Sequence, residues 1–341
     1  MNTVNTYRIS FIMLISLFFI VLAMNISFGS VDIPLKDIFD ILFNKSTTNE
    51  NWQIIVTEFR IPKAITAIFA GSALAVSGLL MQTLFRNPLA GPYILGISSG
   101  ASLGIALLIL LVSLGGFSTI LLSNWSFIIA AAIGAFSIML LVVIMASKIK
   151  NTMSILIIGL MFGSFASAII SIMAYFSSAS QLQQFIAWSF GNLGNHTSQE
   201  LWIYFGFYIV GIIPLLFLIK PLNSLLLGEN YAQSLGVNIK NVRFSILVIT
   251  SLLTGLVTAF SGPIAFVGLA VPHLTKLIFN TSNHLILIPA VLLNGAILML
   301  ISDTIAQLPN IEYTLPINAI TSLFGAPIVI WLIVRKRKLN F

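Results

Sequence analysis

Long apolar runs recur along the whole of this chain, and each is about 17 to 25 residues long, the length that a helix needs to cross the hydrocarbon core of a bilayer. The 341 residues are 58% hydrophobic and only 7% charged, whereas an ordinary soluble domain has about 25% charged residues. The repetition of the runs excludes a single anchor attached to a soluble domain. We therefore expect an all-α polytopic membrane protein, with residues 1–341 forming one transmembrane domain.

The apolar runs predict about ten membrane-spanning helices and cytoplasmic N- and C-termini. The first run has no small-residue cleavage site, so we interpret it as a retained first span rather than a signal sequence. The expected helices lie near residues 9–28, 62–84, 92–112, 125–147, 153–175, 200–219, 241–260, 264–279, 285–304 and 316–335.

The distribution of charge supports this topology. With a cytoplasmic N-terminus, twelve of the sixteen basic residues fall in inside segments, as the positive-inside rule requires. Those residues are Arg8, Arg86, Lys148, Lys150, Lys220, Lys240, Arg243, Lys276, Arg335, Lys336, Arg337 and Lys338. The net charge of +7 is thereby explained by membrane orientation, and no basic stripe with interleaved aromatics indicates nucleic acid, so we expect membrane lipid and no nucleic acid as a partner.

Two segments are polar enough to lie outside the membrane. Residues 29–61 form an expected outside loop, and residues 221–241 form an expected cytoplasmic hairpin of two short helices that meet at Gly228 and present Glu229. On periodicity alone, a hairpin that merely joins two spans is an equally good interpretation.

No enzyme signature is present. The three histidines do not form an HExxH motif, the chain has no cysteine, and the GISSG of residues 96–100 lacks the preceding strand that a nucleophile elbow requires. No phosphate-binding loop ends in Gly-Lys-Ser/Thr, so ATP-driven work would need a partner. We expect no catalytic residue and no metal site. Asp303, near the outer end of the ninth helix, is the one candidate for an ion-coupling residue, and we expect it to reach the interface.

The segment from Leu84 to Gly104, LFRNPLAGPYILGISSGASLG, contains residues that destabilise a helix, because proline removes a backbone donor and glycine costs about 1 kcal/mol relative to alanine. The segment is therefore not selected for helix stability.

Small residues at four-residue spacing allow helices to approach closely in a membrane. They are Gly71, Ser72, Ala75 and Gly78 on the second helix and Gly96, Gly100 and Gly104 on the third.

Several motifs in order resemble the permease subunits of type II ABC importers for iron-siderophore, haem and cobalamin. They are RIPKAITAIFAGSALAVSGLLMQTLFRNPLAGPYILGISSGASLG, LLLGENYAQSLGV, SGPIAFVGLAVPHLTK and LPINAITSLFGAPIVIWLIVRKRK. The resemblance covers residues 60–337, and it implies that Arg86, Asn87 and Pro88 form a tight inner turn while Gly96 and Gly100 pack near the translocation path.

The resemblance also implies partners. Two permease copies, expected to be a homodimer, would form the pathway, a cytoplasmic ABC ATPase dimer would bind below, and an extracytoplasmic substrate-binding protein would dock outside. ATP and Mg would be bound by the ATPase, and this chain is expected to bind no cofactor. The ATPase-coupling residues implied are Leu227, Gly228, Glu229, Ala232, Leu235 and Gly236.

Further roles follow from the same resemblance. Arg60 and Lys63 would contact acidic groups of the binding protein, with ordinary anchoring at the interface as the alternative, and Thr152 would be a cytoplasmic gate residue. Some relatives have arginine at a third docking position where this chain has Gln307, which departs from the pattern.

The expected function is therefore that of a permease subunit in the bacterial inner membrane, importing an iron chelate such as a ferric siderophore. Haem or cobalamin is the alternative cargo, and an ion-coupled secondary transporter is the alternative from a different class.

Overall fold

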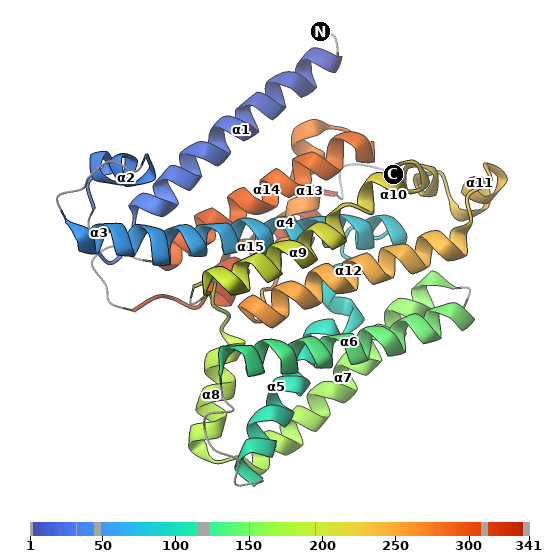
Figure 1. The fold of residues 1–341 in the computed structure, drawn as a ribbon. Coiled ribbons are helices and arrows are strands. Elements are labelled where there is room, and N and C mark those ends of the chain that lie inside the picture. Colours follow the sequence, from blue (N-terminus) through green and yellow to red (C-terminus); the bar gives the residue numbers. More distant parts are fainter. Residues whose placement is uncertain are drawn as a thin grey trace.

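The computed structural model describes residues 3–31, 33–43, 49–114, 123–149, 151–194, 196–307 and 313–336. Every regular element within these ranges is a helix, which confirms the all-α prediction (Figure 1). The chain ends and residues 32, 44–48 and 308–312 of the outer segments lie outside the described residues, as does Lys150.

The helices follow one another through short connections. Their bounds are α1 Thr3–Ser27, α2 Leu35–Leu42, α3 Glu50–Ile54, η1 Ile55–Arg60, α4 Ile61–Leu84, η2 Pro92–Leu95, α5 Ile97–Leu114, α6 Asn124–Lys148, α7 Thr152–Phe176, α8 Ala179–Ser189, α9 Ser198–Ile212, α10 Leu215–Leu226, α11 Glu229–Ser234, α12 Ile239–Ser261, α13 Val267–Phe279, α14 His284–Ala306 and α15 Ile317–Lys336.

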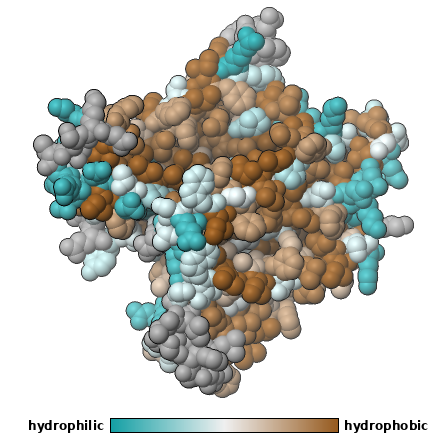
Figure 2. Space-filling model, viewed as in Figure 1, coloured by the Kyte–Doolittle hydropathy of each residue, from teal (hydrophilic) through white to brown (hydrophobic). Residues whose placement is uncertain are grey.

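Among the described residues, six helices are long and apolar enough to cross a membrane, and the count becomes seven if the bent pair α9–α10 is taken as one span. Three shorter apolar helices, 97–110, 267–279 and 317–331, cover the remaining predicted runs. An apolar surface lies between hydrophilic residues gathered at opposite edges of the molecule (Figure 2). This is the distribution that a bilayer requires of a polytopic protein.

The structure differs from the prediction in three segments. Residues 50–60, expected in the outside loop, are helical and continue into α4, because a turn of π-helix at Ile55–Arg60 precedes Pro62 and lets the chain pass the proline. The predicted span 200–219 bends by 40° between α9 and α10, where Pro214 interrupts the helix. The helix α10 extends to Leu226, so the predicted hairpin 221–241 begins inside it.

Helix α8, between α7 and α9, was also not predicted. Helix α8 starts with a capping box in which the Ser178 side chain accepts a bond from the Gln181 backbone and the Gln181 side chain accepts one from Ser178. The spacing Ser-x-x-Gln is a readable signal for a helix start, and it would have revealed this element.

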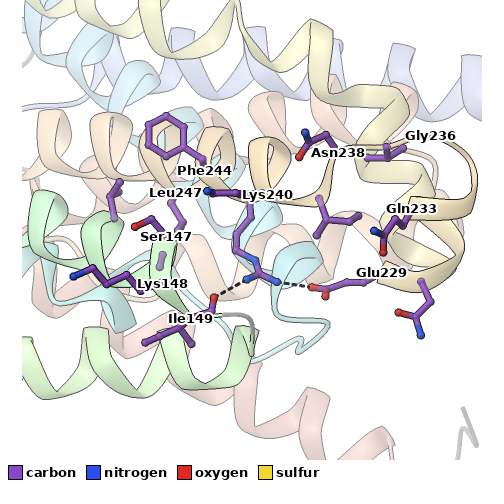
Figure 3. Close-up of a pocket in the computed structure, with 16 residues that line it drawn as sticks. Ser147, Lys148, Ile149, Glu229, Gln233, Gly236, Asn238, Lys240, Phe244 and Leu247 are labelled. Atoms are coloured by element: carbon purple, nitrogen blue, oxygen red, sulfur yellow. Dashed lines mark hydrogen bonds and ion pairs between the residues drawn. The ribbon is translucent and has the colours of Figure 1, made fainter.

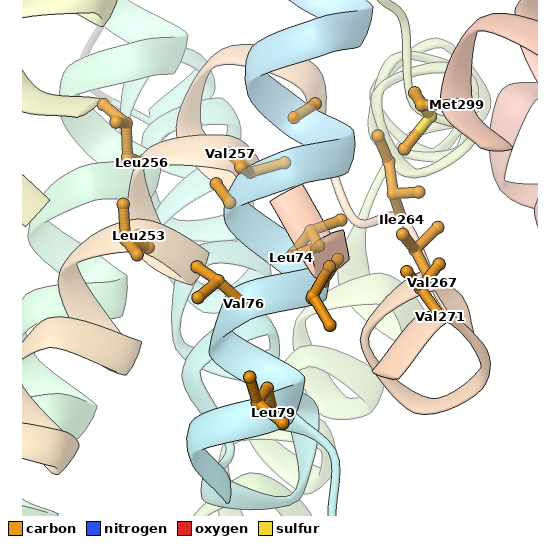
Figure 4. Close-up of a cluster of buried hydrophobic side chains, with 14 of the residues drawn as sticks. Leu74, Val76, Leu79, Leu253, Leu256, Val257, Ile264, Val267, Val271 and Met299 are labelled. Carbon is orange, nitrogen blue, oxygen red and sulfur yellow. The ribbon is translucent and has the colours of Figure 1, made fainter. Parts of the chain in front are cut away.

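Helix α4 lies at the centre of the bundle, and nearly all of its side chains from Ala70 to Leu84 are buried. It packs against α12, α13 and α14, which come from distant parts of the sequence (Figure 1). Figure 4 shows Leu74, Val76 and Leu79 of α4 among side chains of α12, α13 and α14. Because lipid is as apolar as these side chains, the packing contacts themselves stabilise the arrangement.

Glycines place the backbone of α4 directly against its neighbours. A methyl group at Gly71 would overlap the carbonyl oxygen of Gly295 in α14, and one at Gly78 would overlap that of Gly268 in α13. The small residues predicted on this helix are therefore explained by helix packing, since no larger side chain fits between the backbones.

The segment that begins at Leu84 forms a turn followed by a delayed helix start. Arg86 adopts a left-handed conformation with φ of 49°, η2 covers only Pro92–Leu95, and Gly96 has φ of 74° before α5 starts at Ile97. The third predicted helix therefore begins five residues later than expected, because glycine at position 96 supplies the positive φ that ends η2.

The glycine contacts predict that Gly78→Ala destabilises the protein, by about 1–3 kcal/mol, because the added methyl forces α4 and α13 apart. The midpoint of unfolding in detergent measures the effect. Gly206→Ala is the matched control, since no atom lies within 4 Å of a methyl at this exposed helical position and alanine is the better helix former. Equal unfolding midpoints for the two variants would contradict the packing argument.

Candidate functional site

The hairpin between α10 and α12 is a structured element at one end of the bundle. Gly228 separates α10 from α11 with φ of 112°, and Gly236 follows α11 with φ of 84°. These positive values are accessible to glycine and strained for other residues, so the two positions fix the path of the hairpin. The predicted break at Gly228 is where the structure has it.

The hairpin exposes three large apolar side chains at four-residue spacing. Leu227, Tyr231 and Leu235 are 64%, 53% and 58% exposed, respectively. Tyr231 was not among the predicted coupling residues, although its spacing from Leu227 and Leu235 could have revealed it. Ala232 differs from the prediction, because it is completely buried and cannot form part of an outward packing surface. We call Leu227, Tyr231 and Leu235 the apolar hairpin surface.

The Glu229 side chain is only partly exposed, and its carboxylate contacts two residues from other helices. Its Oε1 accepts hydrogen bonds from Thr152 Oγ1 at 2.9 Å and from Arg243 Nη2 at 3.1 Å. Arg243 Nη2 also donates to Thr152 Oγ1 at 3.1 Å, and Nη1 donates to the carbonyl oxygen of Ile149 at 3.1 Å. The predicted coupling residue and the predicted gate residue are thus in direct contact.

Arg243 is the residue that sequence reasoning missed at this site. It lies in the first turns of α12 and is only 8% exposed. The sequence placed it among the inside basic residues, and no local pattern distinguished it from Lys240. Its contacts border a groove of about 730 Å³ between α6, α11 and α12 (Figure 3).

Thr152 occupies the start of α7, where Asn151 caps the helix by accepting a bond from the backbone N–H of Met153 at 2.9 Å. A second hollow, of about 850 Å³, is lined by Thr152, Arg86 and Glu229 with their neighbours. The inner turn, the hairpin and the start of α7 therefore border one space.

The inner turn contacts the hairpin directly. Arg86 Nη2 donates to the carbonyl oxygen of Leu226 at 3.1 Å, at the end of α10. Asn87 Oδ1 accepts a bond from the backbone N–H of Leu89 at 2.9 Å and closes the turn around Pro88. This turn therefore holds the end of α10 in place as well as reversing the chain.

Gly96 and Gly100 lie in helix contacts within the chain. A methyl at Gly96 would come within 2.8 Å of the carbonyl oxygen of Gly159 in α7, and one at Gly100 would come within 2.5 Å of that of Gly134 in α6. Their expected place beside a translocation path stays a prediction.

At the opposite end of the bundle, Arg60 is turned into the protein. It is 7% exposed, and its guanidinium donates to the carbonyl oxygens of Ile26 at 2.8 Å and Ser27 at 2.7 Å and to that of Val31. These carbonyls lie at and just beyond the C-terminus of α1, where helix carbonyls lack partners within the helix. The contacts support the anchoring alternative for Arg60, and its docking role stays a prediction.

Lys63 pairs with Asp303 across 3.0 Å. Asp303 is 2% exposed and also accepts hydrogen bonds from Asn25 Nδ2 at 2.9 Å and from Gln307 Nε2. Asp303 was expected to reach the interface. It is buried instead, because α1, α4 and α14 supply partners that satisfy its charge. Gln307, where this chain departs from the docking pattern, donates a hydrogen bond to Asp303 of this pair.

A second buried carboxylate is that of Glu200, which is only 1% exposed. It accepts a bond from the Thr197 backbone at 2.8 Å in a capping box and lies 3.8 Å from His196 Nδ1. Burial lowers the pKa of His196, although the nearby carboxylate opposes the shift, so the imidazole is neutral at neutral pH.

These features define a class of protein. A helical membrane bundle that exposes a structured apolar hairpin at one basic end is typical of a membrane protein that binds a partner outside the bilayer. No group of three or more metal-binding side chains occurs among the described residues. The match to a family model then identifies the family. Residues 15–335 match the FecCD transport family, so the chain belongs to it and is a permease subunit of a type II ABC importer.

Individual proteins agree with this assignment. The chain is 35% identical over 324 residues to the hemin transport system permease HmuU of Yersinia pestis, covering 94% of this chain and 95% of that protein. It is 35% identical over 290 residues to the vitamin B12 import system permease BtuC of Salmonella typhimurium, covering 84% and 85%. A solved ABC transporter assigned to the metal-chelate type, in an inward-facing conformation, has a TM-score of 0.83 at 28% identity and covers 96% of this chain and 99% of its own.

The relatives confirm the transport role and the location. The chain is a multi-pass protein of the bacterial inner membrane, and members of its family are permeases of ABC importers, which work with an ATPase and a substrate-binding protein.

The anchoring contacts predict that Arg60→Gln lowers the free energy of unfolding by about 1–3 kcal/mol, because several carbonyls lose a charged donor. Unfolding in detergent without any binding protein measures this loss, with the exposed outer Lys36→Gln as control. If Arg60→Gln unfolds normally but captures the binding protein poorly, the docking role is correct and the anchoring role is not.

Proposed function

We propose that this chain forms, with a second permease copy, the translocation pathway for an iron chelate of the ferric siderophore type. A substrate-binding protein delivers the chelate from outside, and a cytoplasmic ABC ATPase dimer drives the transport. The observation that carries the proposal is the apolar hairpin surface, where Leu227, Tyr231 and Leu235 are each more than half exposed.

The hairpin is the contact for the ATPase in this proposal. Apolar side chains exposed together on a polar end of a protein favour a docking surface, because burying them removes apolar area from water. Leu227 and Leu235 keep their predicted coupling role, and Tyr231 joins them. Gly228 and Gly236 set the shape of the hairpin, and ATP and Mg belong to the ATPase rather than to this chain.

A second copy of the chain is the proposed partner within the membrane. Helix α7 leaves an apolar ridge exposed at about four-residue spacing, comprising Ile157, Met161 and Phe165, which are 57%, 53% and 67% exposed. A ridge of this kind packs equally well against lipid or against a helix. Pairing two copies along α7 brings their Thr152 residues toward a shared cytoplasmic end, in keeping with a gate role.

The cargo is proposed from chemistry that the relatives share. They are named for hemin, vitamin B12 and a metal chelate, and each of these cargoes holds its metal within an organic ligand. A pathway for such a cargo needs no metal ligands of its own. Haem and cobalamin stay the alternative cargoes.

The ion-coupled alternative has less support. It requires membrane-embedded titratable groups free to exchange a proton or ion. Among the residues that the structure describes, the two buried carboxylates lie near helix ends, where Asp303 is paired with Lys63 and Glu200 belongs to the capping box of α9. Uptake that persisted after ATP depletion, with a proton gradient maintained, would favour this alternative.

Uptake into proteoliposomes tests the cargo. The vesicles contain this permease and its ATPase, and the binding protein is loaded separately with ferric siderophore, haem or cobalamin. We expect ATP-dependent accumulation of the ferric siderophore alone. Accumulation of haem or cobalamin instead would show that the proposed cargo is wrong and that the chain is still part of an importer. ATP-independent accumulation would overturn the proposal.

Substitutions on the hairpin test the docking surface. The double variant Tyr231→Ser, Leu235→Ser should weaken capture of the ATPase by roughly tenfold or more, because two exposed anchors lose their apolar area. Phe43→Ser is the matched control, since Phe43 is 73% exposed on the predicted outer side. Co-purification of the ATPase at graded concentrations measures capture, and equal capture by the double variant and the control would place the docking surface elsewhere.

A further inference from the structure

We infer that Arg243 is a positioning residue that joins the hairpin to the start of α7, so that displacement of the hairpin moves the segment around Thr152. This inference rests on the proposed function only in assuming that the ATPase acts on the hairpin. It adds a residue and a route that neither the motifs nor the comparisons assign.

The route is a junction of three chain segments at one guanidinium. Arg243 Nη1 reaches the Ile149 carbonyl beyond α6, and Nη2 reaches both Thr152 at the start of α7 and Glu229 at the start of α11, each at 3.1 Å. The segments at Ile149 and Thr152 lie beside the predicted gate, and the segment at Glu229 belongs to the hairpin. These four residues, Ile149, Thr152, Glu229 and Arg243, form what we call the arginine junction.

The contacts of the arginine junction are mutually dependent. Thr152 donates its hydroxyl proton to Glu229 Oε1 and accepts from Arg243 Nη2, while the same carboxylate oxygen accepts from Arg243. Hydrogen bonds to ionised groups are roughly twice as strong as neutral ones. A shift of Glu229 therefore cannot occur without changing the bonds of Thr152.

Burial makes the arginine the fixed point. Arg243 is 8% exposed and belongs to α12, whose following turns pack against α4 and α6, whereas the Glu229 side chain is 38% exposed and lies between the two glycine turns of the hairpin. A charged group held in a packed helix resists displacement, since leaving its partners would leave it buried and unpaired. With Arg243 held in place, a displacement of the hairpin reaches α7 through the direct hydrogen bond between Glu229 and Thr152, which Arg243 positions.

The junction has capacity for a second arrangement. Arg243 Nε is buried and has no hydrogen-bond partner, so its N–H is a donor that the present arrangement does not use. A carboxylate that advanced along the guanidinium would engage Nε and Nη2 together, the two-bond geometry that arginine favours. Thr152 would then lose its bond to Glu229 and keep only the one from Arg243, so fewer contacts would hold the start of α7.

The experiment uses the full importer, with permease, ATPase and binding protein in lipid nanodiscs. The permease has no cysteine, so a single Met153→Cys reporter next to Thr152 reports the accessibility of the gate segment through its rate of maleimide labelling. Labelling rates are compared with and without ATP, and transported cargo per ATP hydrolysed is measured in proteoliposomes.

We expect Arg243→Gln to hydrolyse ATP while losing the ATP-dependent change in labelling and about tenfold or more of the cargo transported per ATP, a size typical of coupling between sites. Glu229→Gln, which keeps its shape and loses its charge, should show the same loss in weaker form. Arg243→Lys should restore part of the coupling, because lysine keeps the charge but cannot span all three partners.

Lys240→Gln is the matched control. It removes the same charge from an exposed position in the first turn of α12 and should leave labelling and coupling unchanged. If Arg243→Gln fails to assemble, the Glu229→Gln variant carries the test. A normal ATP-dependent labelling change in Glu229→Gln or in an assembled Arg243→Gln would overturn the inference. Failure of the unaltered permease to bind the ATPase would instead overturn the proposed function.

Discussion

The close approach of helix backbones around α4 determines how the rest of this permease is arranged. In a bilayer the helices gain nothing from leaving lipid, so they are held by contacts that require the backbones to touch. Gly71 and Gly78 allow this contact with α14 and α13, and a side chain as small as a methyl would prevent it. Because α4 is buried almost throughout, its position fixes where α12, α13 and α14 can lie.

Polar junctions at the two ends of the bundle complete this arrangement. At the outer end, Asp303 joins α14 to Lys63 of α4 and to Asn25 of α1. At the end predicted to face the cytoplasm, Arg243 joins α12 to the start of α7 and to the hairpin. The outer junction is almost fully enclosed, whereas the cytoplasmic one includes a partly exposed carboxylate on a hairpin flanked by glycine turns. This difference fits a rigid outer end and a cytoplasmic end that can respond to a partner.

The predictions from sequence succeeded where they depended on length, composition and motif order, and failed where a partner lay far away in the chain. The break at Gly228 could be predicted because glycine marks a positive φ locally. The burial of Ala232 and the inward contacts of Arg60 could not, since each depends on segments that meet only in the folded chain. Helix α8 was not predicted, although the Ser-x-x-Gln pattern of its capping box can be recognised in the sequence.

The sequence by itself determined that this protein crosses a membrane many times and to which family it belongs, and it predicted which end faces the cytoplasm. Apolar runs, the asymmetry of basic residues and ordered motifs are properties of the linear chain, so no tertiary information is needed to read them. Only the tertiary structure decided that Glu229, Thr152 and Arg243 form one junction and that Asp303 is buried. The physical reason is that a charge in a low-dielectric environment must find its partner in space, and here the partners lie up to 278 residues apart along the chain.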